Sequence, residues 1–190
     1  MRTLYHVSVF HNFADEGVDL SVPGMRQVEE LWDIIDVEVE RLRPLWGKMV
    51  IYQDGLFTST SSLFPYFKRV ASRGSRNIQL ILKLLDHGAR LRKTERLAMV
   101  DMAAMLAQLE GNDLSLGQRR RYDEVCQILL LLRDEYIAYR INLTLRADQV
   151  GLLFLGAAHQ SFKKHLASDI RVKTVISKKL CHSTYYGTEW

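Results

Sequence analysis

The sequence predicts an α/β protein with three layers, in which a mostly parallel sheet of four to five strands has helices on both faces. Two observations predict this fold. Short β-rich segments alternate along the chain with longer segments in which apolar residues recur every three or four positions. Parallel strands need such helical crossovers between them. The 190 residues are also 47% apolar, which is enough for one domain with a sizeable core.

Four segments have the composition of buried or half-buried strands, and a fifth, weaker candidate follows the turn at Gly88. Their apolar residues are mainly β-branched, aromatic or leucine, and they alternate with polar residues or form short runs. The four are residues 4–10, 49–53, 150–155 and 170–176, and the weaker candidate is 89–92.

The first two predicted helices are amphipathic. Residues 25–43 carry apolar side chains on one face and acidic ones on the other; this helix follows Pro23-Gly24 and stops before Pro44. The second covers residues 75–87 and ends at Gly88, as helices often end at glycine.

Two further helices are predicted at 95–109 and from Ser115 to about residue 146. Ser115 and Gln118 have the spacing of a capping box at the start of the longer one. Its middle, residues 125–132, is so apolar that we expect it to pack between the sheet and neighbouring helices.

The domain is expected to span residues 1–176, with a basic and aromatic tail at 177–190. The whole net charge of +4 arises near this end, because residues 160–190 hold six basic and two acidic groups, which leaves 20 of each in the rest. The basic excess is therefore not a property of the strand ends.

Several classes of protein are excluded or disfavoured by the sequence. The longest apolar runs fall short of the roughly 18 residues of a membrane-spanning helix, so no membrane partner is expected. The first residues lack the pattern of a signal peptide, which favours a cytoplasmic location. Cys126 and Cys181 form no CxxC pair, so reduced thiols are expected. Motifs for phosphate-binding loops, zinc proteases and serine hydrolases are lacking.

Titratable side chains follow three of the predicted strands, and reactive groups collect at strand ends in folds of this class. His11 comes after the first strand, Asp54 after the second, and His159 after the strand at 150–155. The candidate site residues are His11, Glu95, Arg133, Arg140 and His159, with Asp15 as an additional acid.

Arg133 and Arg140 are seven residues apart and share one face of the long helix. Two guanidinium groups on such an apolar helix can orient an anionic ligand or stabilise an oxyanion. The alternative is an ion pair with Asp134, Glu135 or a neighbouring loop.

His159 follows Gly156-Ala157-Ala158, small residues that let another group approach closely. It can serve as a general base, a proton shuttle or a metal ligand, and His11 has the same options. The alternative is a histidine that caps a helix or is hydrogen-bonded in the core. The other histidines, His6, His87, His165 and His182, are expected to be structural or on the surface.

The segment Arg133-Asp134-Glu135-Tyr136-Ile137-Ala138, with Arg140-Ile141-Asn142 and the strand closing in Gly156-Ala157-Ala158-His159, resembles the last conserved section of the TraB/Tiki, ChaN and erythromycin-esterase-like superfamily. The resemblance covers about 45 residues well. It implies a metal-dependent or general-base hydrolase, or a relative like those members of the superfamily that bind haem or have no assigned activity. It also points to Glu95 as the mid-chain glutamate, while His11 lacks the glycine and acid that normally precede it.

We therefore expect a small hydrolase whose cleft holds His11, Glu95 and His159, with Arg133 or Arg140 receiving developing negative charge. The same His11, Glu95 and His159 would bind a divalent metal ion if the enzyme uses one.

The main alternative is a non-catalytic protein of the same fold that binds a small ligand or another protein, including a homodimer formed through the long leucine-rich helix. Nucleic-acid binding is disfavoured, because Arg119-Arg120-Arg121 is followed by Asp123 and Glu124 and no recognition motif accompanies it.

Overall fold

The computed structural model describes residues 1–9, 22–58, 61–110 and 113–175. Within them, five strands form one sheet in the order β3-β2-β4-β1-β5, and all neighbouring strands are parallel. The strands are β1 (Arg2–Val9), β2 (Met49–Gln53), β3 (Arg90–Arg92), β4 (Val150–Gly156) and β5 (Ile170–Thr174). The predicted α/β class, including the weak third strand, is confirmed.

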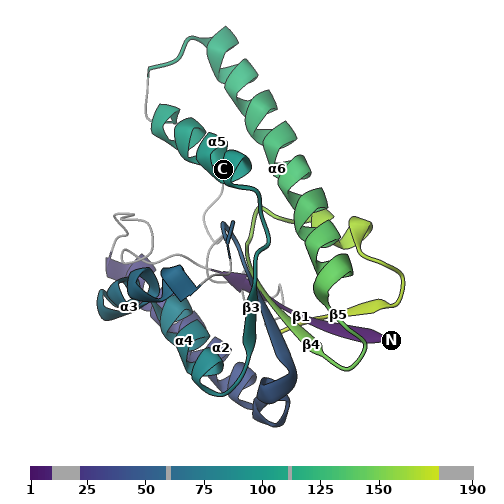
Figure 1. The fold of residues 1–190 in the computed structure, drawn as a ribbon. Helices are drawn as coiled ribbons and strands as arrows, with labels where there is room; N and C mark the ends of the chain where they lie inside the picture. Colours follow the sequence, from purple (N-terminus) through teal and green to yellow (C-terminus); the bar gives the residue numbers. More distant parts are fainter. Residues whose placement is uncertain (10–21, 59–60, 111–112, 176–190) are drawn as a thin grey trace.

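Helices cover both faces of this sheet, which gives the three layers (Figure 1). One face packs against α2 (Val22–Glu40), α3 (Phe64–Ser72) and α4 (Arg76–Asp86). The other packs against the C-terminal half of α6 (Leu116–Thr144) and the short helix η3 (Ser161–His165). The short helices η1 (Arg43–Lys48) and η2 (Ser61–Leu63) precede β2 and α3, and α5 (Leu97–Leu109) precedes α6.

The buried faces follow the apolar periodicity of the sequence. In α2 the side chains of Val28, Trp32, Ile35 and Val39 are fully buried. Ser75 caps α4 by accepting a hydrogen bond from the backbone N–H of Ile78, which satisfies one of the helix's unpaired donors. The amphipathic pattern thus determined which side of each helix faces the sheet.

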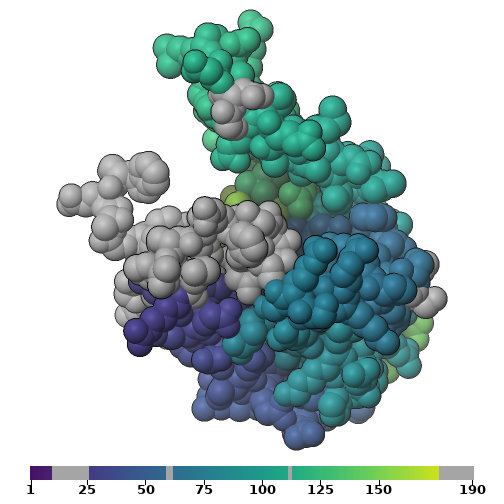
Figure 2. Space-filling view, turned by 90° about the vertical axis from the view of Figure 1, so that its left-hand side faces the viewer, coloured from purple at the N-terminus to yellow at the C-terminus, as the bar shows by residue number. Residues whose placement is uncertain are grey.

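The structure contradicts one packing expectation and adds one α-helix besides the three short 3₁₀ helices. Residues 125–132 do not pack between the sheet and neighbouring helices as a whole. Leu129 is buried, but Val125, Ile128, Leu131 and Leu132 are 44–58% exposed. The N-terminal half of α6 projects past the sheet together with α5 (Figures 1 and 2), so it has no sheet to cover. The additional element is α3, which the sequence analysis does not place.

No helix in the described part of the chain is both long enough and apolar enough to cross a membrane.

Candidate functional site

The carboxyl ends of β3, β2 and β4 lie side by side, and each is followed by a titratable side chain. Asp54 follows β2, Glu95 follows β3, and His159 follows β4. Arg133 and Asp134 reach the same place from α6. These five residues form one connected cluster, which we call the strand-end cluster.

The loops that carry Asp54 and Glu95 are tied together by backbone contacts. The N–H groups of Thr94 and Glu95 both donate to the carbonyl oxygen of Leu56, at 2.8 and 3.0 Å, and the Thr94 hydroxyl donates to that of Gln53. Gly55 has a positive φ of 72°, a turn conformation that side chains disfavour. Its N–H then points at Oε1 of Glu95, 2.7 Å away.

Arg133 bridges the two loops. Its guanidinium donates to both oxygens of Glu95, from Nε at 2.6 Å and from Nη2 at 2.8 Å. The same Nη2 donates to Oδ1 of Asp54 at 2.7 Å. The Glu95 side chain is fully buried, and those of Arg133 and Asp54 are 16% and 15% exposed. Burial lowers the pKa of Arg133, but the hydrogen bonds to Glu95 and the charge of Asp54 raise it by a larger amount. The net pKa is therefore raised and the guanidinium stays charged.

His159 lies between two carboxylates. Its Nδ1 donates to Oδ1 of Asp134 at 2.6 Å, and its Nε2 faces Oδ2 of Asp54 at 3.5 Å. The other oxygen of Asp134 accepts hydrogen bonds from the backbone N–H groups of Ser161 and Phe162 and from the Ser161 hydroxyl. Because a carboxylate accepts and does not donate, this pairing places a proton on Nδ1 and leaves Nε2 facing Asp54.

Both aspartates are held in the ionised state. Burial raises the pKa of Asp54. The nearby His159 and Arg133, together with hydrogen bonds to the carboxylate, lower this pKa by more, so it lies below the ordinary value of 3.8. Burial also raises the pKa of Asp134, and the hydrogen bonds from His159 and Ser161 again produce a net lowering.

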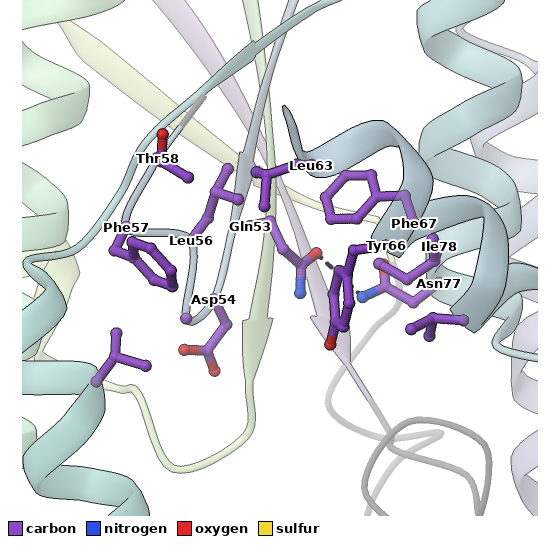
Figure 3. A pocket seen from close by; sticks show the side chains of 13 residues that line it. Gln53, Asp54, Leu56, Phe57, Thr58, Leu63, Tyr66, Phe67, Asn77 and Ile78 are labelled. Atoms are coloured by element: carbon purple, nitrogen blue, oxygen red, sulfur yellow. Dashed lines mark hydrogen bonds between the residues drawn. The ribbon is translucent and has the colours of Figure 1, made fainter. Parts of the chain in front are cut away.

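A cavity of about 450 Å³ opens beside the cluster, between the end of β2 and helices α3 and α4. Asp54 is the one charged residue among the described residues that line it. The walls are mainly apolar, and Figure 3 shows Gln53 and Asn77 adding polar groups, with the Asn77 amide donating to Oε1 of Gln53 at 3.0 Å. The other lining side chains include Leu56, Phe57, Leu63, Tyr66, Phe67, Val70, Ile78 and Val100.

Three of the five residues expected at the site do converge: Glu95, Arg133 and His159. Arg140 does not join them, and instead its Nε lies 3.4 Å from the carbonyl oxygen of Lys93, to which it donates. His11, like Asp15, lies outside the described residues. The ion-pair alternative for Arg133 is also realised, through the neighbouring loops that carry Glu95 and Asp54, while Asp134 pairs with His159.

Sequence reasoning did not select Asp54 or Asp134. Asp54 directly follows a predicted strand, which is the signal that marked His159, so the same rule could have selected it. Asp134 was considered as a partner of its neighbour Arg133. Adjacent helix residues point about 100° apart, so the two reach different groups.

Glu95 and His159, two of the three residues expected to bind a metal ion, already have other partners, while the third, His11, lies outside the described residues. Both oxygens of Glu95 already bind Arg133, and Nδ1 of His159 is bonded to Asp134. Among the described residues, no group of three His, Cys, Asp or Glu side chains is placed to hold a metal ion.

Comparison of the chain with protein-family models, with curated proteins and with solved structures gave no match.

Proposed function

We propose that the protein is a general acid–base hydrolase that cleaves esters of apolar acids, with the substrate in the cavity beside Asp54. One observation carries the proposal. Asp54 lines the cavity and also faces His159, whose other ring nitrogen is bonded to Asp134. The cavity is thus connected to a histidine that is oriented by a carboxylate, the arrangement expected for a general base.

The reaction would begin with a water molecule between the substrate and Asp54. Water attacks the ester carbonyl carbon and gives a proton to the Asp54 carboxylate, which passes it to Nε2 of His159. The resulting imidazolium lies between Asp54 and Asp134, and both carboxylates stabilise its charge. Breaking the carbon–oxygen bond then returns the proton to the departing alcohol, so a carboxylic acid and an alcohol are formed and the site is restored.

Arg133 and Glu95 would position Asp54 and not react themselves. Glu95 is fully buried and has no path to a substrate in the cavity. Arg133 holds Oδ1 of Asp54 and thereby turns Oδ2 towards His159. No step requires a metal ion. The resemblance of the Arg133–His159 section to a superfamily that contains hydrolases agrees with the proposal.

The test is hydrolysis of 4-nitrophenyl esters of increasing acyl length by the full chain. Asp54→Asn keeps the size and one acceptor for Arg133, and His159→Gln removes the base, so each is expected to lower kcat at least 100-fold. Circular dichroism verifies that each variant keeps its fold at the assay temperature. Asp148→Asn is the matched control, because Asp148 is exposed in the polar pocket formed beside Met49 and Gln149. Full activity of Asp54→Asn would overturn the mechanism.

A second substitution tests the cavity. Ile78→Trp places a larger side chain in it and is expected to raise KM for long acyl esters with little change in kcat. Ile34→Trp, on the outer side of α2, should leave both constants unchanged.

The second candidate is a small-ligand-binding protein without turnover. It is favoured by the pairing of the buried Glu95 with Arg133 and by the burial of His159, whose side chain is 4% exposed. It predicts that 4-nitrophenyl butyrate raises the thermal midpoint of the wild type but not of Ile78→Trp, and that no nitrophenol is released.

A further inference from the structure

One side of α6 carries an apolar surface that faces solvent. We call Val125, Ile128, Leu131, Leu132 and Tyr139 the outer stripe; they are 44–58% exposed. Their spacing places them on one side of the helix. The buried residues Asp134, Ile137 and Ile141 lie on the opposite side, towards the sheet and η3.

We propose that the outer stripe is the interface of a homodimer in which α6 packs antiparallel against α6 of a second copy, with Ile128 at the two-fold axis. A two-fold interface brings the same surface of both copies together, so residues equally far from Ile128 in opposite directions face each other.

Charge complementarity selects this partner and this orientation. Arg121 and Glu135 are both exposed, and each lies seven residues, or two turns, from Ile128 on the side that carries the outer stripe. The antiparallel pair places Arg121 opposite the partner's Glu135 twice. A parallel pair would place Arg121 beside the partner's Arg121 and Glu135 beside the partner's Glu135, and these like charges repel each other.

The shapes also match in this register. Gly117 and Tyr139 are each eleven residues from Ile128, so the exposed Tyr139 ring faces the partner's Gly117. The space where a side chain would stand at Gly117 is open, with no atom within 4 Å. The bulkiest residue of the outer stripe thus meets the smallest residue of the helix.

The exposed area is sufficient for a reversible dimer. Five side chains about half exposed offer roughly 500 Å² of mainly apolar surface, close to the apolar share of the about 800 Å² that each partner buries in a standard interface.

Sedimentation velocity of the full chain from 1 to 100 µM tests the proposal. The wild type is expected to shift from monomer to dimer over this range, and Ile128→Glu to remain monomeric, because two glutamates would meet at the axis. Arg121→Glu or Glu135→Arg alone should raise the dissociation constant at least tenfold. The double substitution should return it to within about threefold of wild type.

Lys68→Glu, an exposed charge reversal on α3, is the matched control and should not change the dissociation constant. Circular dichroism verifies that each variant keeps its helices. A wild type that is monomeric at 100 µM, a dimer that persists in Ile128→Glu, or a double variant that stays as weak as the singles would each overturn the proposal. The first result would indicate that a different protein covers the outer stripe, and the last would contradict the Arg121–Glu135 pairing.

Discussion

His159 donates from Nδ1 to Oδ1 of Asp134 at 2.6 Å, although the two residues are 25 positions apart and lie on different elements. The same carboxylate accepts three hydrogen bonds from Ser161 and Phe162, at the start of η3. Asp134 therefore fixes both the ring and the turn that follows it. The link attaches the end of β4 to α6, which carries the rest of the cluster.

The first prediction concerns this link. Asp134→Asn should lower the free energy of unfolding by about 2–3 kcal/mol, because the amide has one acceptor oxygen in place of two and no charge to meet its donors. Urea unfolding measures it. Ser161→Ala is the comparison, since it removes one hydroxyl donor from the same carboxylate and should cost about 1 kcal/mol. Equal losses in the two variants would contradict the role assigned to the charge.

The second prediction concerns the ion pair between Arg133 and Glu95. Arg133→Met should cost about 3–5 kcal/mol, because it leaves the fully buried Glu95 carboxylate without its partner. Adding Glu95→Gln should recover part of this loss, since the amide oxygen can still accept from Gly55. Arg26→Ala breaks an exposed pair with Glu30 and should change stability by less than about 0.5 kcal/mol. A double variant no more stable than Arg133→Met would argue against an unpaired charge as the cause.

The third prediction is a loss of stability in acid. The pKa values of Asp54 and Asp134 lie below the ordinary 3.8 in the folded protein, so the unfolded chain binds protons first as the pH falls. Their contribution is complete above the unfolded pKa and is lost as the pH drops through the lower folded values. Urea unfolding at pH 6, 5, 4 and 3 should show stability falling below about pH 4. Asp134→Asn should show a shallower decline; an identical slope would exclude Asp134 as a source.

The sequence was sufficient to predict the sheet and most helices, because burial on one face imposes a period of two or of three to four on the apolar residues. It failed where tertiary position decides the outcome. The apolar run at 125–132 was predicted to be buried, but nothing in a helix's own pattern tells whether it extends past the sheet. The helix α3 is only nine residues long and follows a hydroxyl-rich stretch that reads as a loop, so the sequence analysis does not place it.

The site was predictable to the extent that strand ends meet at one edge of a parallel sheet. That rule brings Glu95 and His159 together, and Arg133 follows from the cost of burying a charge. Pairing could not be predicted in the same way. Whether Arg133 meets Asp134 or Glu95 depends on how α6 is rotated about its axis, and that rotation is set by packing against β2 and β4.

The final prediction tests the close approach at Gly156. A side-chain carbon added there would lie 3.2 Å from Oδ2 of Asp54 and 3.8 Å from Cδ2 of His159. The Gly156 N–H also donates to the same Oδ2 at 3.3 Å. Gly156→Ala should therefore push the Asp54 carboxylate away from its position beside the ring.

Under the proposed mechanism, kcat for 4-nitrophenyl esters should fall at least tenfold in Gly156→Ala, because small displacements of reacting groups are costly. The unfolding free energy should change by only about 1 kcal/mol, since the carboxylate borders the cavity and can move.

Gly47→Ala is the control for this substitution, because no atom lies within 4 Å of the added carbon, and it should leave kcat unchanged. The ¹⁵N signal of His159 Nε2 gives a readout independent of turnover: it should shift in Gly156→Ala and not in Gly47→Ala. An unshifted signal with unchanged kcat would mean that the separation of Asp54 and His159 does not matter for the chemistry.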